Sequence, residues 1–235
     1  MKKYILQFIF ILLFTSIFNS CSSEQESNQS NQGVIEFDIS YPVKDFNLSM
    51  EIFLPKTMTM TYKNNVYKNE VANKLFTSIM ISDCDKKQMT LILTYGKQKN
   101  IYTILNEQDI IDMFKSSPAP YFINNNTKED LLGFICSKHY GIYNNLEDGH
   151  DFEILETTQI PIKNSNWCNQ YSNFKGVLLG YEIEKYGMTM KFNARSINQS
   201  TSISDATFNI PEKHKKVSLD KFLWEMESIF SLVLN

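Results

Sequence analysis

Hydrophobic and polar residues alternate along most of the chain after Gly33, and this period of two is typical of β-strands. The clearest case is Thr57–Lys63, where Met58 and Met60 share one face and threonines share the other. The Asn64-Asn65 pair after it predicts a tight hairpin turn. Further strands are predicted at residues 34–41, 66–71, 75–81, 89–95, 101–105, 134–143, 152–155, 177–184 and 188–194.

Two segments follow the helical period instead. Residues 109–114 predict a short helix, which the prolines at 118 and 120 end. Ser218 can cap a C-terminal helix with an apolar stripe of Leu219, Phe222, Leu223, Met226, Ile229, Phe230 and Val233. The asparagine-rich residues 124–127 are expected to form a loop. The pattern therefore indicates a mainly β (α+β) fold, with antiparallel strands and a C-terminal helix lying against the sheet.

The N-terminus has the features of a secretory signal. Lys2 and Lys3 precede an apolar run at residues 4–18, which is shorter than the ~20 residues that a membrane-spanning helix needs. Phe18-Asn19-Ser20-Cys21 resembles a lipobox, the site at which a lipoprotein signal peptide is cleaved. We expect residues 1–20 to be removed and Cys21 to carry the lipid. An ordinary secreted protein with an incidental Cys21 is the alternative.

Polar residues fill the stretch after Cys21 and offer nothing to bury, so residues 21–32 read as a lipidated, flexible tether. Ser22 stands where some Gram-negative lipoproteins have the aspartate of an inner-membrane retention signal. The expected location is therefore the outer membrane, on its periplasmic face or at the cell surface. Residues 33–235 form the predicted single domain.

Composition and charge limit the classes of binding partner that we expect. The whole chain has a formal net charge of −3, and removal of Lys2 and Lys3 leaves 21 basic and 26 acidic side chains, a net charge of −5. Such a surface repels phosphate backbones, so nucleic acid is not expected as a partner. The hydrophobic fraction of 43% is too high for a chain that is disordered throughout.

Three segments carry a family resemblance: Gly133-Phe134-Ile135-Cys136-Ser137-Lys138, Phe174-Lys175-Gly176-Val177-Leu178-Leu179-Gly180-Tyr181 and Phe208-Asn209-Ile210-Pro211-Glu212. In order and spacing they resemble Gram-negative bacterial lipoproteins related to the LolA/LolB lipoprotein-carrier fold. The resemblance implies a strongly curved antiparallel sheet, a half-barrel, with the C-terminal and middle helices packed on its concave apolar face. Such a face can hold acyl chains. No catalytic residue comes with the resemblance.

Motifs for catalysis are missing from the sequence: it has no phosphate-binding glycine loop, no Gly-x-Ser-x-Gly and no His-Glu-x-x-His. We therefore expect no enzyme and no cofactor. The acidic segment Glu147-Asp148-Gly149-His150-Asp151 could bind a divalent cation, but its order and spacing do not match an EF-hand loop, and we favour a solvated acidic turn. Met58 and Met60, with Met188 and Met190, could bind Cu(I) as thioethers; as flexible apolar side chains they fit better as the lining of a ligand cavity.

The odd number of cysteines after Cys21 predicts one disulfide and one free thiol in an oxidising compartment. We expect Cys136 to pair with Cys168, because both lie in the C-terminal half, and leave Cys84 free. Closing a loop of that size stabilises by about 3 to 4 kcal/mol on the chain-entropy estimate.

Three functions remain open at this point. The first is a noncatalytic, membrane-anchored domain that binds a lipid or another hydrophobic ligand in the half-barrel. The second is a structural or assembly lipoprotein, in which the helix fills the concave face and the exterior binds an envelope protein. The third is a metal (Cu) or thiol redox protein that uses the methionine pairs or the free thiol.

Overall fold

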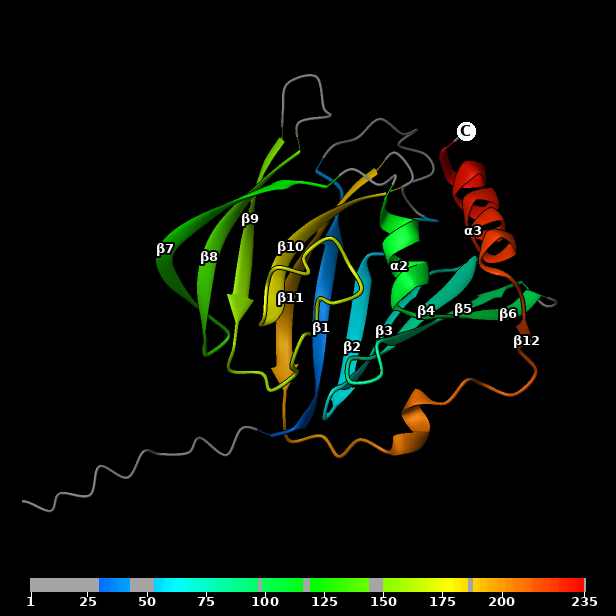
Figure 1. Ribbon diagram of the computed structural model, residues 1–235, viewed down its shortest axis with the longest axis horizontal. Coiled ribbons are helices and arrows are strands. Elements are labelled where there is room, and N and C mark those ends of the chain that lie inside the picture. The colour runs from blue at the N-terminus through cyan, green and yellow to red at the C-terminus, as the bar shows by residue number, and fades with distance from the viewer. Residues whose placement is uncertain are drawn as a thin grey trace, which may run out of the picture.

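The computed structural model describes residues 30–42, 53–96, 99–115, 119–143, 150–185 and 188–234. The predicted signal peptide, Cys21 and the tether up to residue 29 lie outside these residues. In the described part of the chain, twelve strands form one curved, unclosed sheet, accompanied by two α-helices (Figure 1). This arrangement confirms the predicted fold class, a mainly β half-barrel with helices on its concave face.

The strands are β1 (Gln32–Ser40), β2 (Thr57–Lys63), β3 (Val66–Ala72), β4 (Phe76–Asp83), β5 (Gln88–Tyr95), β6 (Lys99–Leu105), β7 (Tyr121–Leu131), β8 (Phe134–Tyr143), β9 (His150–Thr157), β10 (Val177–Lys185), β11 (Met188–Asn198) and β12 (Lys215–Lys216). Their order in the sheet is β12-β6-β5-β4-β3-β2-β1-β11-β10-β9-β8-β7. All neighbours pair antiparallel except β12, which runs parallel to β6. Two meanders, β1–β6 and β7–β11, therefore meet where β1 pairs with β11.

The strict alternation in β2 decides which of its side chains enter the core. Met58 pairs across from Phe37 and Met60 from Ile35, and all four side chains are at most 5% exposed. The Asn64-Asn65 turn then leads into β3, as predicted, with Asn64 in the left-handed region at φ 55°. Period two thus places the apolar set of these strands on the concave face.

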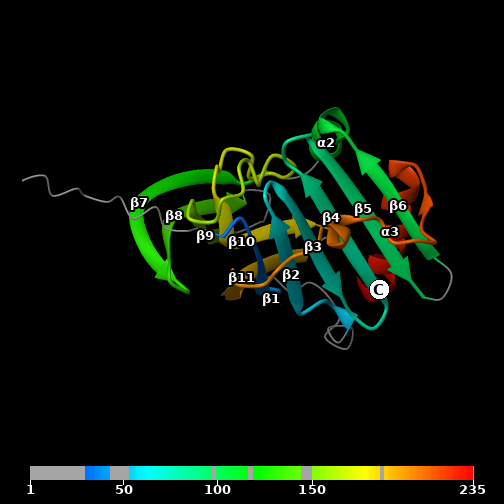
Figure 2. The same cartoon turned by 90° about the horizontal axis from the view of Figure 1, so that it is seen from below.

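Three segments cover that concave face: α2 (Glu107–Phe114), α3 (Leu219–Leu234) and residues 158–176 (Figure 1 and Figure 2). Asn106 and Asp109 form a capping box at the start of α2, and Ser218 accepts the Lys221 amide at the start of α3, as its sequence position predicted. Phe230 of α3 packs edge-on against Phe76 of β4, with 5.7 Å between ring centroids. No helix among the described residues is long and apolar enough to cross a bilayer.

The prediction of a loop at residues 124–127 is wrong, because this segment lies inside β7. The register of β7 against β8 shifts between Asn124 and Lys128, which marks a bulge. β7 is the last strand of the sheet, so one of its sides faces no neighbour and polar side chains are tolerated there. An edge strand can therefore have the composition of a loop.

Candidate ligand-binding groove

A segment that we call the strap, residues 199–214, crosses the convex face of the sheet between β11 and β12. Its orange ribbon passes over β3 and β4 in Figure 2. Near its start, the Ile203 amide donates to Gln32 Oε1 at 3.1 Å, and the Ile203 side chain is 7% exposed. Near its end, His214 Nε2 lies 3.0 Å from Thr94 Oγ1 of β5. The strap is thus joined to the sheet at both ends.

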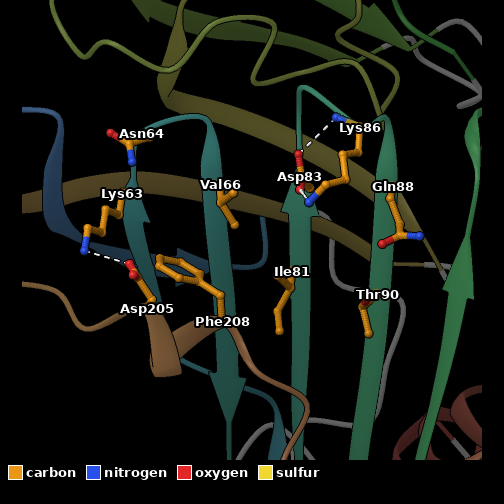
Figure 3. Close-up of a pocket in the computed structure, with 10 residues that line it drawn as sticks. All are labelled: Lys63, Asn64, Val66, Ile81, Asp83, Lys86, Gln88, Thr90, Asp205 and Phe208. Atoms are coloured by element: carbon orange, nitrogen blue, oxygen red, sulfur yellow. Dashed lines mark hydrogen bonds and ion pairs between the residues drawn. The ribbon is translucent and has the colours of Figure 1, made fainter.

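Between these ends the strap contains one turn of 3-10 helix, η2 (Asp205–Phe208). Ser204 caps this turn by accepting the Ala206 amide, and Asp205 pairs with Lys63 of β2 at 2.7 Å. Lys63 also donates to the Ile203 carbonyl at 3.1 Å. These contacts place Phe208 above the sheet, where it lines a pocket (Figure 3).

Two adjoining pockets of about 360 and 700 Å³ lie between the strap and the sheet, and Ile81 lines both. We call them together the convex groove. Its floor is apolar, with Ile79 and Ile81 of β4 beside Ile92 of β5. The remaining lining residues are Lys63, Asn64, Val66, Lys68, Asp83, Lys86, Gln88, Thr90, Asp205, Ala206, Thr207, Phe208, Asn209, Ile210, Pro211 and Glu212. The groove is therefore long, with an apolar floor and a polar rim.

The charges on the rim are largely paired. Lys86 binds Asp83 at 2.7 Å, as Figure 3 shows, and Lys68 binds Glu70 at 3.0 Å. Burial raises the pKa of Asp83, but the hydrogen bonds and charge of Lys86 outweigh this effect, so the pKa lies below its usual value. Histidine and cysteine are absent from the described residues that line the groove. The groove thus combines a few isoleucines with a larger number of polar and charged side chains.

The four methionines predicted to line a ligand cavity lie on the concave side. Met58, Met60 and Met188 are 5%, 5% and 1% exposed and belong to the main core, while Met190 is partly buried against it. They pack between the sheet and its covering segments, not along the convex groove. Among the described residues, no three His, Cys, Asp or Glu side chains gather as a metal site.

The predicted disulfide between Cys136 and Cys168 is absent, and both residues are free thiols, as is Cys84. Cys136 lies on β8 with its thiol directed at the Phe134 carbonyl, 3.5 Å away. Cys168 instead contacts the Tyr67 hydroxyl of β3 at 3.3 Å. Cys136 and Cys168 thus have different contact partners, because closeness along the chain does not determine which strands a connecting segment crosses.

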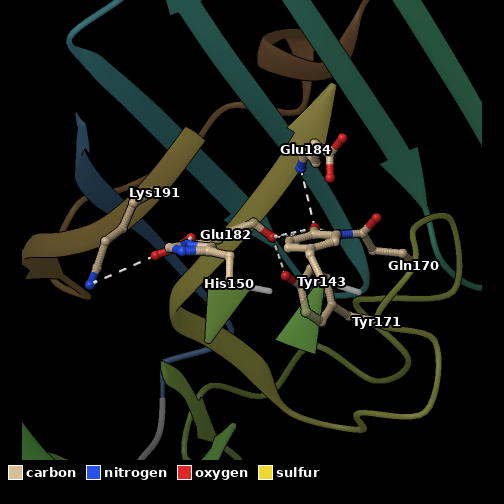
Figure 4. Close-up of polar contacts among 7 residues, drawn as sticks. All are labelled: Tyr143, His150, Gln170, Tyr171, Glu182, Glu184 and Lys191. Carbon is tan, nitrogen blue, oxygen red and sulfur yellow. Dashed lines mark hydrogen bonds and ion pairs between the residues drawn. The ribbon is translucent and has the colours of Figure 1, made fainter. Parts of the chain in front are cut away.

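The candidate cation-binding segment is described only from His150 onward, since residues 147–149 lie outside the described part. His150 Nε2 lies 2.6 Å from the carboxylate of Glu182, which is 2% exposed, and Lys191 lies 3.9 Å from the same group. Figure 4 shows Tyr143 and Tyr171 directing their hydroxyls at the Glu182 carbonyl. His150 therefore has a structural partner of its own.

A separate pocket of about 590 Å³ lies beside His139 near the edge of the sheet. His139 Nδ1 contacts Asn124 Oδ1 at 3.1 Å, and its buried Nε2 lies 3.3 Å from Glu156 without the alignment of a hydrogen bond. Phe174 packs edge-on against the imidazole. Residues from β7, β8 and β9 line this pocket, so no local sequence motif predicts it.

Sequence reasoning also missed the convex groove, although a signal for it exists. Ile79-Met80-Ile81 in β4 and Leu91-Ile92-Leu93 in β5 are apolar on both faces of the strand. Continuous apolar runs of this kind are typical of strands that are covered on both sides. The sequence thus held a sign that something covers the convex face, without identifying residues 199–214 as the cover.

The comparisons with known proteins bear on the fold and on nothing else. No protein-family model and no curated protein matches the chain. Two solved structures of a protein named PNGF-II, in space groups C2 and P21, are similar, with TM-scores of 0.52 and 0.53 and identities of 10% and 11%. The similarity covers 82% and 83% of this chain but 32% and 33% of PNGF-II, so the chain spans about a third of that protein's length.

Proposed function

We propose that the protein is a lipid-anchored envelope protein that binds an elongated apolar ligand, an acyl chain, in the convex groove. The signal-like N-terminus ending in Cys21 supports the anchor. The proposal keeps the hydrophobic-ligand function expected from the sequence and moves the site from the methionine face to the opposite face of the sheet. The resemblance to LolA/LolB carriers stays a prediction.

The observation that carries this proposal is the isoleucine floor beneath the strap. Two adjoining pockets share Ile81, with Ile79 and Ile92 beside it, while Phe208 and Ile210 line the groove from the strap. Ile81 and Ile92 are 8% and 1% exposed. An acyl chain bound there would gain about 0.8 kcal/mol for each methylene removed from water. The rim of paired lysines and carboxylates adds no strong net charge, so the polar end of the ligand can remain at the solvent.

Native mass spectrometry of the protein without residues 1–21 tests the proposal, together with titration by a fluorescent fatty acid. We expect a hydrophobic adduct or saturable binding. Ile210→Asp places a charge in the groove and should weaken binding at least tenfold. Ile111→Asp is the matched control, because Ile111 is 50% exposed on α2, and it should bind normally. Equal binding by both variants would exclude the groove as the site.

A second candidate function is docking to an envelope protein, and the free edge of the sheet favours it. Among the strands that the structure describes, none pairs with the outer side of β7, and its Tyr121 and Ile123 are 66% and 52% exposed. Leu132 and Ile135 of the same hairpin are 44% and 46% exposed. A partner could add a strand there through main-chain hydrogen bonds. Protein that carries no adduct and binds no fatty acid would favour this candidate, and a photo-crosslinker at Ile123 should then capture one envelope protein.

A further inference from the structure

Two of the three described cysteines lie in one buried cluster on the concave side. Ser82 Oγ lies 3.8 Å from Cys84 Sγ and 3.8 Å from Cys168 Sγ, so the two thiols share a neighbour. Trp167 donates to the same hydroxyl at 2.8 Å, and the Tyr67 hydroxyl contacts Cys168. The cluster joins the end of β4 to the covering segment 158–176. Its two cysteines, Cys84 and Cys168, are 84 positions apart in the sequence.

The cluster is dry. Ser82 is fully buried, and Cys84 and Cys168 are 3% and 2% exposed. Burial, with a smaller contribution from the neighbouring Cys168, raises the pKa of the Cys84 thiol to about 12 against the opposing effect of the Ser82 hydrogen bond. Burial also raises the pKa of Cys168. In the folded protein both groups are therefore protonated at neutral pH and react slowly as nucleophiles.

We propose that Cys84 and Cys168 are a disulfide pair, joined while the chain folds in an oxidising compartment. The cluster is the observation that carries this, because both sulfurs lie 3.8 Å from the same Ser82 hydroxyl and are the two thiols that share a neighbour. Cys136 has no such neighbour among the described residues: its thiol contacts a backbone carbonyl on its own strand. The inference is independent of the convex groove and of its ligand.

The oxidant is a second disulfide, either of a protein or of glutathione. One thiolate of the unfolded or partly folded chain attacks it, which forms a mixed disulfide and releases one thiol. The second thiolate attacks the mixed disulfide at the chain's own sulfur, which closes the Cys84–Cys168 bond and releases the second thiol. Two protons and two electrons thus pass from the two cysteines to the oxidant.

A disulfide at this place would fix the covering segment to the sheet. Residues 158–176 contact β3 and β4 through two hydrogen bonds. The Tyr67 hydroxyl donates to the Ser165 backbone carbonyl at 2.8 Å, and the Trp167 indole donates to the Ser82 hydroxyl. The covalent bond would add to these contacts and close the chain between β4 and the segment before β10. Opening of the segment would then require reduction.

The test uses full-length protein purified from membranes in detergent. It is reduced, unfolded in urea and refolded with reduced and oxidised glutathione, and free thiols are then alkylated for peptide mapping without reduction. We expect one linked pair, Cys84 with Cys168, in the wild type and in Cys136→Ser. Cys84→Ser and Cys168→Ser should each yield no internal link. A link through Cys136, or free Cys84 and Cys168 in refolded protein, would overturn the proposal.

A second measurement covers the case in which a cysteine variant does not fold. Refolded wild type and Cys136→Ser are each unfolded in urea with and without dithiothreitol. We expect the reductant to lower the midpoint equally in both proteins. A midpoint that does not respond to the reductant would count against a Cys84–Cys168 bond. Because these measurements concern refolding in solution, they do not depend on binding of a ligand in the convex groove.

Discussion

Glu182 is a carboxylate that is 2% exposed, and its neighbours explain how the fold accommodates it. His150 Nε2 lies 2.6 Å from one oxygen, and Lys191 Nζ lies 3.9 Å from the other. An isolated buried carboxylate would be costly, and hydrogen-bonded partners reduce that cost. The residue therefore depends on a histidine that comes 32 positions earlier in the chain.

Replacement of His150 by alanine should lower the free energy of unfolding by about 1.5 to 3 kcal/mol, the usual range for a hydrogen bond to a charged group. The reason is that the buried Glu182 carboxylate would lose its shortest contact. Urea unfolding followed by circular dichroism measures the change. His214→Ala removes contacts to the Thr94 hydroxyl and the Pro211 carbonyl, neither of which is a charged group, and should cost less; a larger loss in that control would contradict this explanation.

Gly141 of β8 lies opposite the Phe152 ring, which leaves no space for a side chain at position 141. It pairs across from Phe152, which is 3% exposed and stacks on Tyr143 with 5.1 Å between ring centroids. A Cβ at position 141 would lie well inside van der Waals contact of the Phe152 ring. The missing side chain therefore makes room for an aromatic core residue.

Gly141→Ala should accordingly destabilise the protein by about 1 to 3 kcal/mol, the typical cost of overpacking a core. Gly180→Ala is the control, because its Cβ would come no closer than 3.3 Å to Leu155. Thermal unfolding of both variants provides the comparison. If Gly141→Ala were as stable as the wild type, the Phe152 ring would have to move freely.

At the scale of elements, α3 is held on β6 by charge as well as by its apolar stripe. Glu225 is 6% exposed, and Lys99 of β6 donates to it at 2.5 Å. Lys221, one turn earlier in the helix, contacts its other oxygen at 3.0 Å. The hydrogen bond from Lys99, with a smaller contribution from Lys221, lowers the pKa of Glu225 below its usual 4.5 against the opposing effect of burial.

This pair predicts how stability depends on pH. Because the pKa of Glu225 is lower in the folded state, its contribution is complete above pH 4.5 and is lost as pH falls through the folded pKa. Glu225→Gln should be less stable than the wild type by about 1 kcal/mol at pH 7, since both lysines are half exposed. Urea unfolding should show this difference shrinking below pH 4.5. A difference that stays the same between pH 7 and pH 3 would contradict this explanation.

The elements that sequence predicted well are those whose environment is local. β2 begins and ends at the predicted residues because strict alternation suits a strand with one buried face. β7 was missed in part because an edge strand needs little hydrophobicity. The strap was missed because its few apolar residues bury only against a face of the sheet that other strands provide. The convex groove, the Glu182 contacts and the thiol cluster each join segments far apart in sequence, which periodicity alone does not bring together.

At the scale of the whole molecule, the proposed lipid anchor makes the location of the domain depend on one residue, Cys21. Cys21→Ser should abolish labelling by a palmitate analogue and release the protein from the membrane fraction, because the acyl chains would be lost. Metabolic labelling and fractionation measure both effects. Ser22→Ala keeps the cysteine and should leave labelling intact, whereas labelling of the Cys21→Ser protein would refute the anchor.

The meeting of the two meanders at β1 and β11 has a consequence for the order of folding. Every strand from β2 to β6 pairs with its predecessor in sequence, whereas β1 must wait for residues 188–198 to complete its second side. Long-range pairing of this kind is slow, because the ends of a long loop must meet. Hydrogen-exchange labelling during refolding should therefore find the amides of β3–β5 protected before those of β11. A chain that emerges from its N-terminus would carry β1 with an open edge until almost all of it had emerged, and that interval is when it most needs a chaperone.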